Sequence, residues 1–117
     1  MNLMEELNAL GANTKEGMGR VMDDADLYKM MLGMFVDSLN AEPVREEEFD
    51  GADLDELCHK VHTLKGTTGN LSLTPLFEAY MEILTLLRAG NAAEAKKLYV
   101  KMAPVQQAFV DCINRGR

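Results

Sequence analysis

Hydrophobic residues recur every three or four positions through most of the chain, and polar residues fill the positions between them. This spacing places the hydrophobic side chains on one face of an amphipathic helix. No alternating run of apolar and polar residues is long enough to form a sheet. The pattern predicts four long helices, over residues 24–40, 54–71, 75–88 and 92–113.

Residues typical of helix ends support these boundaries. Short polar side chains accept hydrogen bonds from the free N–H groups of a first turn, and glycine adopts the left-handed conformation in which many helices end. Pro104 is expected to kink or break the last helix, because it lacks the backbone N–H that a helix interior uses. The predicted N-caps are Asp23, Asp53 in a capping box with Glu56, Thr74 before Pro75, and Asn91, and the predicted ends are Gly11, Pro43 and Gly90.

Two stretches lie outside the four long helices. Residues 2–10 predict a short amphipathic turn or helix, and Thr14 is expected to cap a second short segment that runs to about Val21. Residues 42–56 are rich in acidic side chains, and we interpret them as a solvated loop that leads into the next helix.

The expected fold class is all-α, an up-down-up-down antiparallel four-helix bundle with an extra short N-terminal helical segment. The predicted connections between the helices are short, which favours antiparallel neighbours. The chain has 117 residues, of which 47% are hydrophobic, enough for one domain with one core. Residues 1–117 are therefore interpreted as a single domain.

Charge and cysteine content narrow the function. The formal net charge of −7 argues against a nucleic-acid-binding protein, which would normally carry a basic surface, and against an anionic membrane surface as a partner. No apolar run approaches the roughly 18 residues of a membrane span. Cys58 and Cys112 form neither a disulfide framework nor a CxxC motif, so we expect reduced thiols in a cytoplasmic protein.

The segment from Asp53 to Leu71 carries the candidate chemistry. At about 100° per residue it divides into a core stripe and a second stripe at its edge. Glycine inside a helix costs about 0.8–1 kcal/mol relative to alanine, so two glycines beside an imidazole indicate a face kept clear for a phosphoryl group or a partner. The core stripe is Leu54, Leu57, Val61, Leu64, Thr68 and Leu71, and the second stripe is His62, Lys65, Gly66 and Gly69.

Other interpretations of these residues stay open at this point. A lone histidine on a helix is usually a surface residue, and glycines also permit close helix packing. His59 lies near the same face but lacks a lysine and a glycine at the matching offsets, so we interpret it as a bystander. Cys58 and His62 have the i, i+4 spacing of some zinc ligands, but the chain has no second His or Cys pair to complete a site.

The run His62-Thr63-Leu64-Lys65-Gly66 resembles the His-x-Leu-Lys-Gly signature of the histidine phosphotransfer (HPt) domains of two-component phosphorelays. The five-residue motif is moderately specific, and a four-helix pattern on either side of it makes the match strong. The resemblance covers about residues 14–113. It includes Gly17-Met18-Gly19-Arg20, Asp24 to Tyr28 and Met34-Phe35 upstream, and Asn70-Leu71, Leu76 and Arg88-Ala89-Gly90-Asn91 downstream.

The resemblance implies a phosphocarrier. His62 would accept a phosphoryl group from an aspartate of one receiver domain and pass it to another, Lys65 would stabilise the phosphoryl charge, and Gly66 would leave room for the partner. The implied partners are response-regulator receiver domains, with a hybrid sensor kinase as a further candidate. Mg²⁺ is expected on the receiver, and the chain is expected to need no cofactor or metal of its own. It has no ATP-binding segment, so it is not expected to be a kinase or an independent enzyme.

One departure and two alternatives accompany this resemblance. The family often has glycine where this chain has Ser72, from which we expect a small change in the turn. One alternative is a helical bundle that binds receivers but carries no phosphate, and the other is a purely structural bundle with no affinity for receivers. Under the phosphocarrier interpretation, we expect an apolar docking patch near His62, formed by its own helix and the helix that holds Met30 to Phe35.

Overall fold

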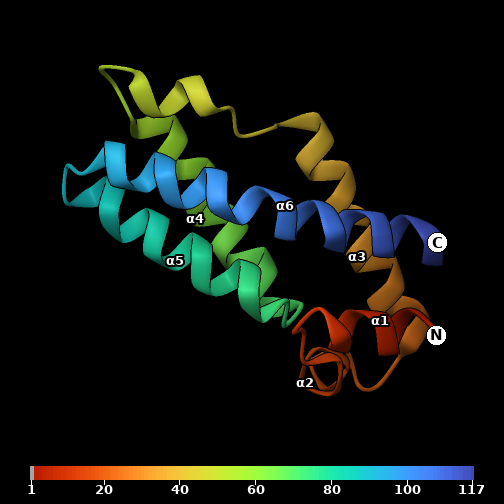
Figure 1. The fold of residues 1–117 in the computed structure, drawn as a ribbon. Helices are drawn as coiled ribbons and strands as arrows, with labels where there is room; N and C mark the ends of the chain where they lie inside the picture. Colours follow the sequence, from red (N-terminus) through yellow and green to blue (C-terminus); the bar gives the residue numbers. More distant parts are fainter. Residues whose placement is uncertain (1) are drawn as a thin grey trace.

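The computed structural model describes residues 2–117, and every regular element within them is helical (Figure 1). The all-α prediction is therefore confirmed. No helix in these residues is both long enough and apolar enough to traverse a lipid bilayer. The helices are α1 (Leu3–Ala9), α2 (Thr14–Gly19), α3 (Ala25–Ala41), the short 3₁₀-helix η1 (Glu46–Asp50), α4 (Asp55–Asn70), α5 (Thr74–Arg88) and α6 (Ala92–Gly116).

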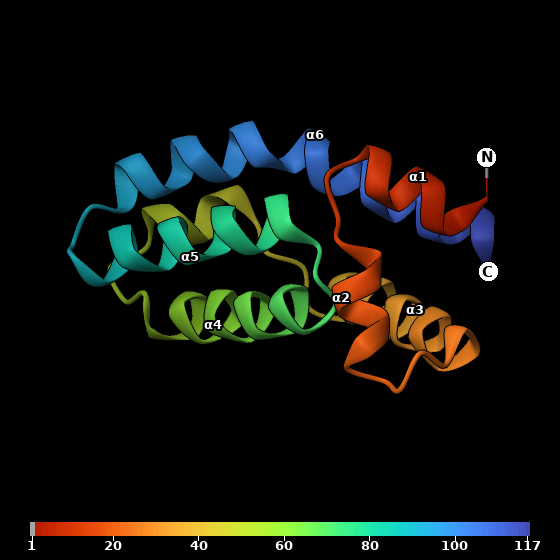
Figure 2. The ribbon, with the colours of Figure 1, turned by 90° about the horizontal axis from the view of Figure 1, so that it is seen from below.

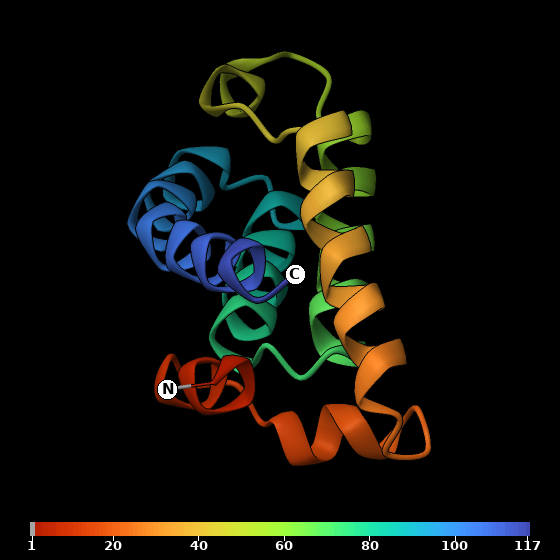
Figure 3. The same cartoon turned by 90° about the vertical axis from the view of Figure 1, so that its right-hand side faces the viewer.

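The four long helices alternate in direction along the chain. The backbones of α4 and α5, and those of α5 and α6, lie close together along their lengths, so α5 is sandwiched between its two neighbours (Figure 2). Helix α3 contacts α6 and lies beside α4 (Figure 3), but its backbone keeps a larger distance from α4. Helix α1 packs against the end of α6, which brings the two termini together.

One continuous core joins the helices. On α4, the predicted core stripe is buried except for Leu54, which is half-buried. On α3, not every apolar residue is buried, because Met30 and Met34 face solvent. The buried residues of α3 are Tyr28, Leu32, Gly33, Phe35 and Val36, and those of α5 are Leu76, Tyr80, Ile83, Leu84 and Leu87.

Three predicted N-caps, Thr14, Asp23 and Thr74, are displaced by one residue. Helix α2 already includes Thr14, and Asn13 caps it by accepting a hydrogen bond of 3.1 Å from the N–H of Glu16. Helix α3 is capped by Asp24, whose carboxylate accepts a hydrogen bond of 3.1 Å from the N–H of Leu27, while Asp23 adopts a φ of 60° in the preceding turn. Helix α5 already includes Thr74, and Leu73 holds the N-cap position without a side-chain hydrogen bond. Neighbouring polar residues compete for a cap, and the turn geometry decides between them.

The predicted capping box of Asp53 and Glu56 does not form. Leu54 occupies the N-cap position of α4, and the Asp53 carboxylate accepts instead from the N–H of Asp55, at 2.9 Å. The two residues are at positions i and i+2, which is the geometry of a local turn rather than of a helix cap.

The connection between α3 and α4 is neither short nor a plain solvated loop. It contains η1, and it buries Val44 and Phe49. The ring of Phe49 packs on that of Tyr99 from α6, with ring centroids 5.4 Å apart. The Tyr99 hydroxyl donates a hydrogen bond of 2.8 Å to the carbonyl oxygen of Val44. These contacts attach the acidic segment to α6. Its acidic composition had predicted a solvated loop instead.

The remaining boundary predictions are mixed. Gly11 and Gly90 end α1 and α5 in the left-handed conformation, with φ of 105° and 79°, as expected. Asn91 holds the N-cap position of α6, but its side chain makes no capping hydrogen bond. Of the kink or break expected at Pro104, the break does not occur, because α6 runs through this residue. Pro104 and Val100, one turn earlier, are both exposed, so water can solvate the carbonyl that the proline leaves without a donor.

The structure shows how Ser72 is accommodated at a position where the family often has glycine. It lies just beyond α4 with a φ of 56°, a conformation that glycine adopts at no steric cost. Its buried hydroxyl donates a hydrogen bond of 2.7 Å to Glu16 and accepts one from Arg20, and the Arg20 guanidinium also donates to the carbonyl of Asn70 at 3.0 Å. The bonds from Ser72 and Arg20 lower the pKa of the Glu16 carboxyl. Serine therefore ties the end of α4 to α2.

We predict that Ser72→Ala is less stable than Ser72→Gly. Both variants lose the hydrogen bonds of the hydroxyl, worth about 0.5–1.5 kcal/mol each. Only glycine relieves the left-handed conformation, which costs a residue with a Cβ about 1–2 kcal/mol. Urea unfolding of the two variants and the wild type measures the free energy lost with the hydrogen bonds and the free energy of the left-handed conformation. An alanine variant as stable as the glycine variant would contradict the positive φ of Ser72.

Candidate functional site

The outer face of α4 carries the side chains of the predicted site. Leu57, Val61, Leu64 and Thr68 are buried on the opposite side of the helix, and this fixes the rotation of α4 about its axis. His62 and Gly66 are exposed, and Lys65 is half-buried. Residues at i, i+3 and i+4 are neighbours on a helix surface. The fold therefore places His62, Lys65 and Gly66 together at the solvent-facing edge, as the wheel predicted.

No hydrogen bond or ion pair within residues 2–117 engages the side chains of His62 and Lys65. The nearby Lys60 is different, because its ammonium group binds the Glu48 carboxylate at 3.1 Å. The Lys65 ammonium group is thus not neutralised by an acidic neighbour, although the chain is strongly acidic overall. A positive charge one turn from an exposed imidazole favours a phosphoryl group on that imidazole.

The two glycines of the second stripe have different roles. A Cβ atom on Gly66 would meet nothing within 4 Å, so its face is open to a partner. A Cβ atom on Gly69 would lie 2.9 Å from Cδ1 of Phe77 on α5. Gly69 therefore allows α4 and α5 to pack closely. The sequence grouped both glycines as a cleared approach, and the structure assigns only Gly66 to an open surface.

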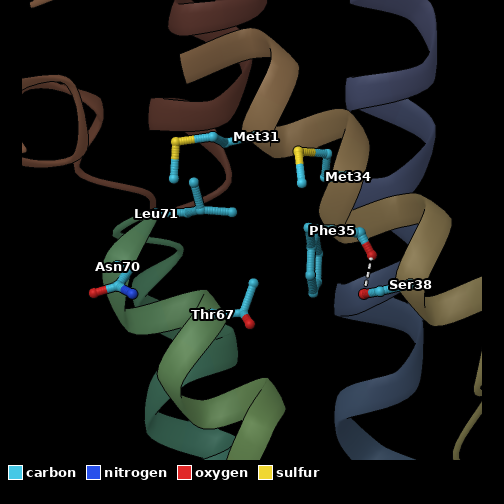
Figure 4. A pocket seen from close by; sticks show the side chains of 7 residues that line it. All are labelled: Met31, Met34, Phe35, Ser38, Thr67, Asn70 and Leu71. Carbon is cyan, nitrogen blue, oxygen red and sulfur yellow. Dashed lines mark hydrogen bonds between the residues drawn. The ribbon is translucent and has the colours of Figure 1, made fainter. Parts of the chain in front are cut away.

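A cavity of about 290 Å³ lies between α3 and the C-terminal half of α4. Figure 4 shows Met31, Met34 and Phe35 of α3 facing Thr67 and Leu71 across it. The Ser38 hydroxyl donates to the carbonyl of Phe35 at 2.9 Å, so it does not need a partner from α4. The cavity exists because α3 stays apart from α4 at the level of the backbone. Its lining is Met31, Met34, Phe35, Ser38, Thr67, Asn70 and Leu71.

Exposed methionines extend this apolar lining onto the surface of α3. Met30 is 57% exposed and Met34 is 61% exposed. They lie one turn apart on α3, and Met34 borders the cavity. Charged side chains would be expected at such positions on a helix that faces only water. The helix that holds Met30 to Phe35 therefore carries exposed apolar side chains, as expected, and their place in a docking patch near His62 stays a prediction. The pattern alone did not tell which methionines face outward.

His59 and Cys58 do not join the site as ligands. His59 lines a separate small cavity with Glu42 and Thr63, on the α3 side of α4. Cys58 is half-buried, and its thiol is free. Within residues 2–117, no three side chains of the His, Cys, Asp and Glu types lie close enough together to hold a metal ion.

Comparison with protein families decides the identity of this helical unit. The model of the Hpt domain matches residues 30–108, about two thirds of the chain. The chain belongs to the Hpt domain family. The matched segment contains α4, with His62, Lys65 and Gly66, as well as α5 and most of α3 and α6. No curated protein and no solved structure matches the chain.

Membership of the Hpt family brings a general role. Hpt domains are phosphocarriers of two-component relays rather than kinases, and they interact with the receiver domains of response regulators. The match begins at Met30, so it leaves out α1, α2 and the first turn of α3. The resemblance in the sequence extends more widely, over about residues 14–113.

Sequence reasoning missed the contribution of α2 to the end of α4. Gly17 lies against the ring of Tyr28 and the carbonyl of Leu71, where a Cβ atom would come within 2.9 Å of both. The hydroxyl of Tyr28 donates to the same carbonyl at 2.7 Å, and burial raises the pKa of Tyr28 to about 12. The only sequence signal for this contact was a glycine, Gly17, inside a short predicted helix. The sequence could not identify its contact with Leu71, which lies far away in the chain.

We predict opposite effects of alanine at the two glycines of α4. Gly66→Ala should stabilise the protein by about 0.5–1 kcal/mol, because alanine is the better helix former and its methyl group meets no other atom. Gly69→Ala should be less stable than Gly66→Ala by at least about 1 kcal/mol, because the Phe77 ring must shift. Thermal and urea unfolding measure both changes. Equal stabilisation by the two substitutions would contradict the close contact at Gly69.

Proposed function

We propose that this Hpt domain transfers phosphoryl groups between receiver domains through His62. The observation that carries the proposal is the exposed imidazole on α4, beside Lys65 and an open backbone at Gly66. No acidic side chain within residues 2–117 forms an ion pair with Lys65. A nucleophile, a cation for the phosphoryl oxygens and a clear approach are what transfer between two proteins requires.

The proposed transfer has two steps, and in each step one bond to phosphorus forms as another breaks. A nitrogen lone pair of His62 attacks the phosphorus of an aspartyl phosphate on the receiver. The bond between phosphorus and the aspartate oxygen breaks, and the carboxylate leaves with the electron pair, while the other ring nitrogen keeps its proton. An aspartate of a second receiver then attacks the phosphohistidine and releases the imidazole. Lys65 balances the charge of the phosphoryl oxygens in each step.

Mg²⁺ belongs to the receiver in this proposal. The acidic residues that would hold it lie on the partner, beside the phosphorylated aspartate. The present chain contributes the acceptor, one cation and the docking surface, and it supplies no ATP site. Addition of EDTA should therefore stop transfer from a receiver, and restored Mg²⁺ should recover it.

We further propose that receivers dock over the seam between α3 and α4. The exposed Met30 and Met34 lie one turn apart on α3, and Met34 borders the cavity. On the other side of this cavity, Thr67, Asn70 and Leu71 follow His62 by five to nine residues. Hpt domains must bring a receiver to the histidine, and the partner therefore covers the surface around it. Flexible methionine side chains suit a surface that meets two different receivers in turn.

The first prediction from the proposed function concerns the acceptor. A phosphorylated receiver should label wild-type protein with acid-labile phosphate, and His62→Gln should remain unlabelled. His59→Gln is the matched control, since it changes the other histidine of the same helix, and it should keep its label. Autoradiography after mixing gives the result.

Absence of label on the wild type with every receiver tried, together with receiver binding by His62→Gln, would favour the alternative. In that case the protein is a helical bundle that only binds receivers. Absence of both label and binding would leave a purely structural bundle.

The second prediction concerns the docking surface. Met34→Glu should lower the rate of transfer from a receiver at least about tenfold, because it places a charge at the rim of the cavity and next to an apolar partner. Val100→Glu is the control: Val100 is a comparably exposed apolar residue on α6, which α5 separates from α4. Rapid-quench experiments with a labelled receiver compare the transfer rates of the two variants. An equal loss in both variants would exclude the α3–α4 seam as the docking surface.

A further inference from the structure

The methionines within residues 2–117 differ widely in exposure. Met102 lies in the core, with 5% of its surface exposed, and Met31 is half-buried at the cavity. Met22, in the turn between α2 and α3, is 93% exposed. Met30 and Met34 are exposed on the proposed docking surface. These two side chains are thus largely open to small solutes, while that of Met102 is shielded.

Oxidation of an exposed thioether changes its chemistry. A hydroperoxide transfers one oxygen atom to the sulfur, which loses two electrons, and the peroxide is reduced to water or an alcohol. The product, methionine sulfoxide, is polar and accepts hydrogen bonds, so it disfavours burial in an apolar interface. Sulfoxide reductases return it to methionine with electrons from thiols.

We propose that Met30 and Met34 are a modification site at which hydroperoxides uncouple the domain from its receivers. The inference rests on the proposed function, because it requires that receivers dock over the α3–α4 seam. The sulfur atoms of Met31 and Met34 both lie at the α3 edge of the cavity (Figure 4), so a sulfoxide at Met34 places a polar group at the mouth of the apolar recess.

The acceptor itself stays intact after this modification. Met30 and Met34 belong to α3, and His62 belongs to α4. Neither methionine belongs to the buried core, which includes other residues of α3 such as Leu32 and Phe35. Their oxidation therefore leaves the helix packing unchanged and adds no group to the imidazole. The device acts on recognition of the protein partner and not on the chemistry of His62.

The experiment compares two phosphoryl donors before and after hydrogen peroxide. One donor is a phosphorylated receiver, which must dock, and the other is phosphoramidate, a small molecule that reaches His62 without docking. Dithiothreitol added after the peroxide reverses reversible oxidation of the half-buried Cys58 and leaves sulfoxides in place. Mass spectrometry of peptides quantifies oxidation at each methionine.

Each protein is compared with its own untreated sample. In the wild type, we expect peroxide to lower transfer from the receiver at least about tenfold and to change labelling by phosphoramidate less than twofold. The double variant Met30→Leu with Met34→Leu should lose the sensitivity to peroxide. Met22→Leu is the matched control at the most exposed methionine, and it should keep the sensitivity. Methionine sulfoxide reductase should restore transfer.

Three results would overturn the proposal. These are undiminished receiver transfer when Met30 and Met34 are oxidised, equal loss with both donors, and unchanged sensitivity in the double leucine variant. A variant with glutamine at both positions gives an independent check, since it should transfer slowly without any peroxide. Failure of the proposed function has a different signature, namely absence of receiver transfer in the untreated wild type.

Discussion

The packing of α4 on α5 is the constraint on which the site depends. Buried residues of α4, from Leu57 to Thr68, set the rotation of this helix, and Gly69 lets the Phe77 ring of α5 approach its backbone. Once the rotation is set, the residues between the core positions must face solvent. His62 is exposed for that reason, and no dedicated loop or pocket is needed to present it. A helix is also a rigid support, which keeps the imidazole, Lys65 and Gly66 in one geometry.

The partner surface depends on the opposite property, a seam that is not closely packed. Helix α3 keeps its backbone away from α4, and its tyrosine, leucine and phenylalanine side chains hold it to the core. At the far end of the molecule, Arg117 donates hydrogen bonds of 2.8 Å to the carbonyl of Gly33 and to Asp37, which fastens α3 to α6. Because α3 is held from the α6 side, its edge toward α4 is left to the cavity and the exposed methionines.

The end of α4 shows how a departure from a family pattern is accommodated. The backbone at Ser72 keeps the left-handed turn that glycine would adopt freely. The strain is offset by hydrogen bonds to Glu16 and Arg20 of the α2 region, which lies outside the segment matched by the family. The turn is therefore supported by residues that lie outside the matched segment. These same contacts seat α2 over the C-terminus of α4, where a second cavity, lined by Gly17, Arg20 and Met31 among others, continues the seam.

The sequence by itself determined the four long helices, the core stripe of α4 and the edge position of His62, because helical periodicity is a local property that burial only amplifies. It also carried the family motif. Tertiary structure decided the rest: which of Asp23 and Asp24 caps α3, that Phe49 anchors the acidic segment, and that α6 runs through Pro104. It also decided that Gly66 is open to solvent while Gly69 packs against Phe77, and that Met34 is exposed while Phe35 is buried. These pairs look alike in the sequence, and they differ only in what lies opposite them, which is set by residues far away in the chain.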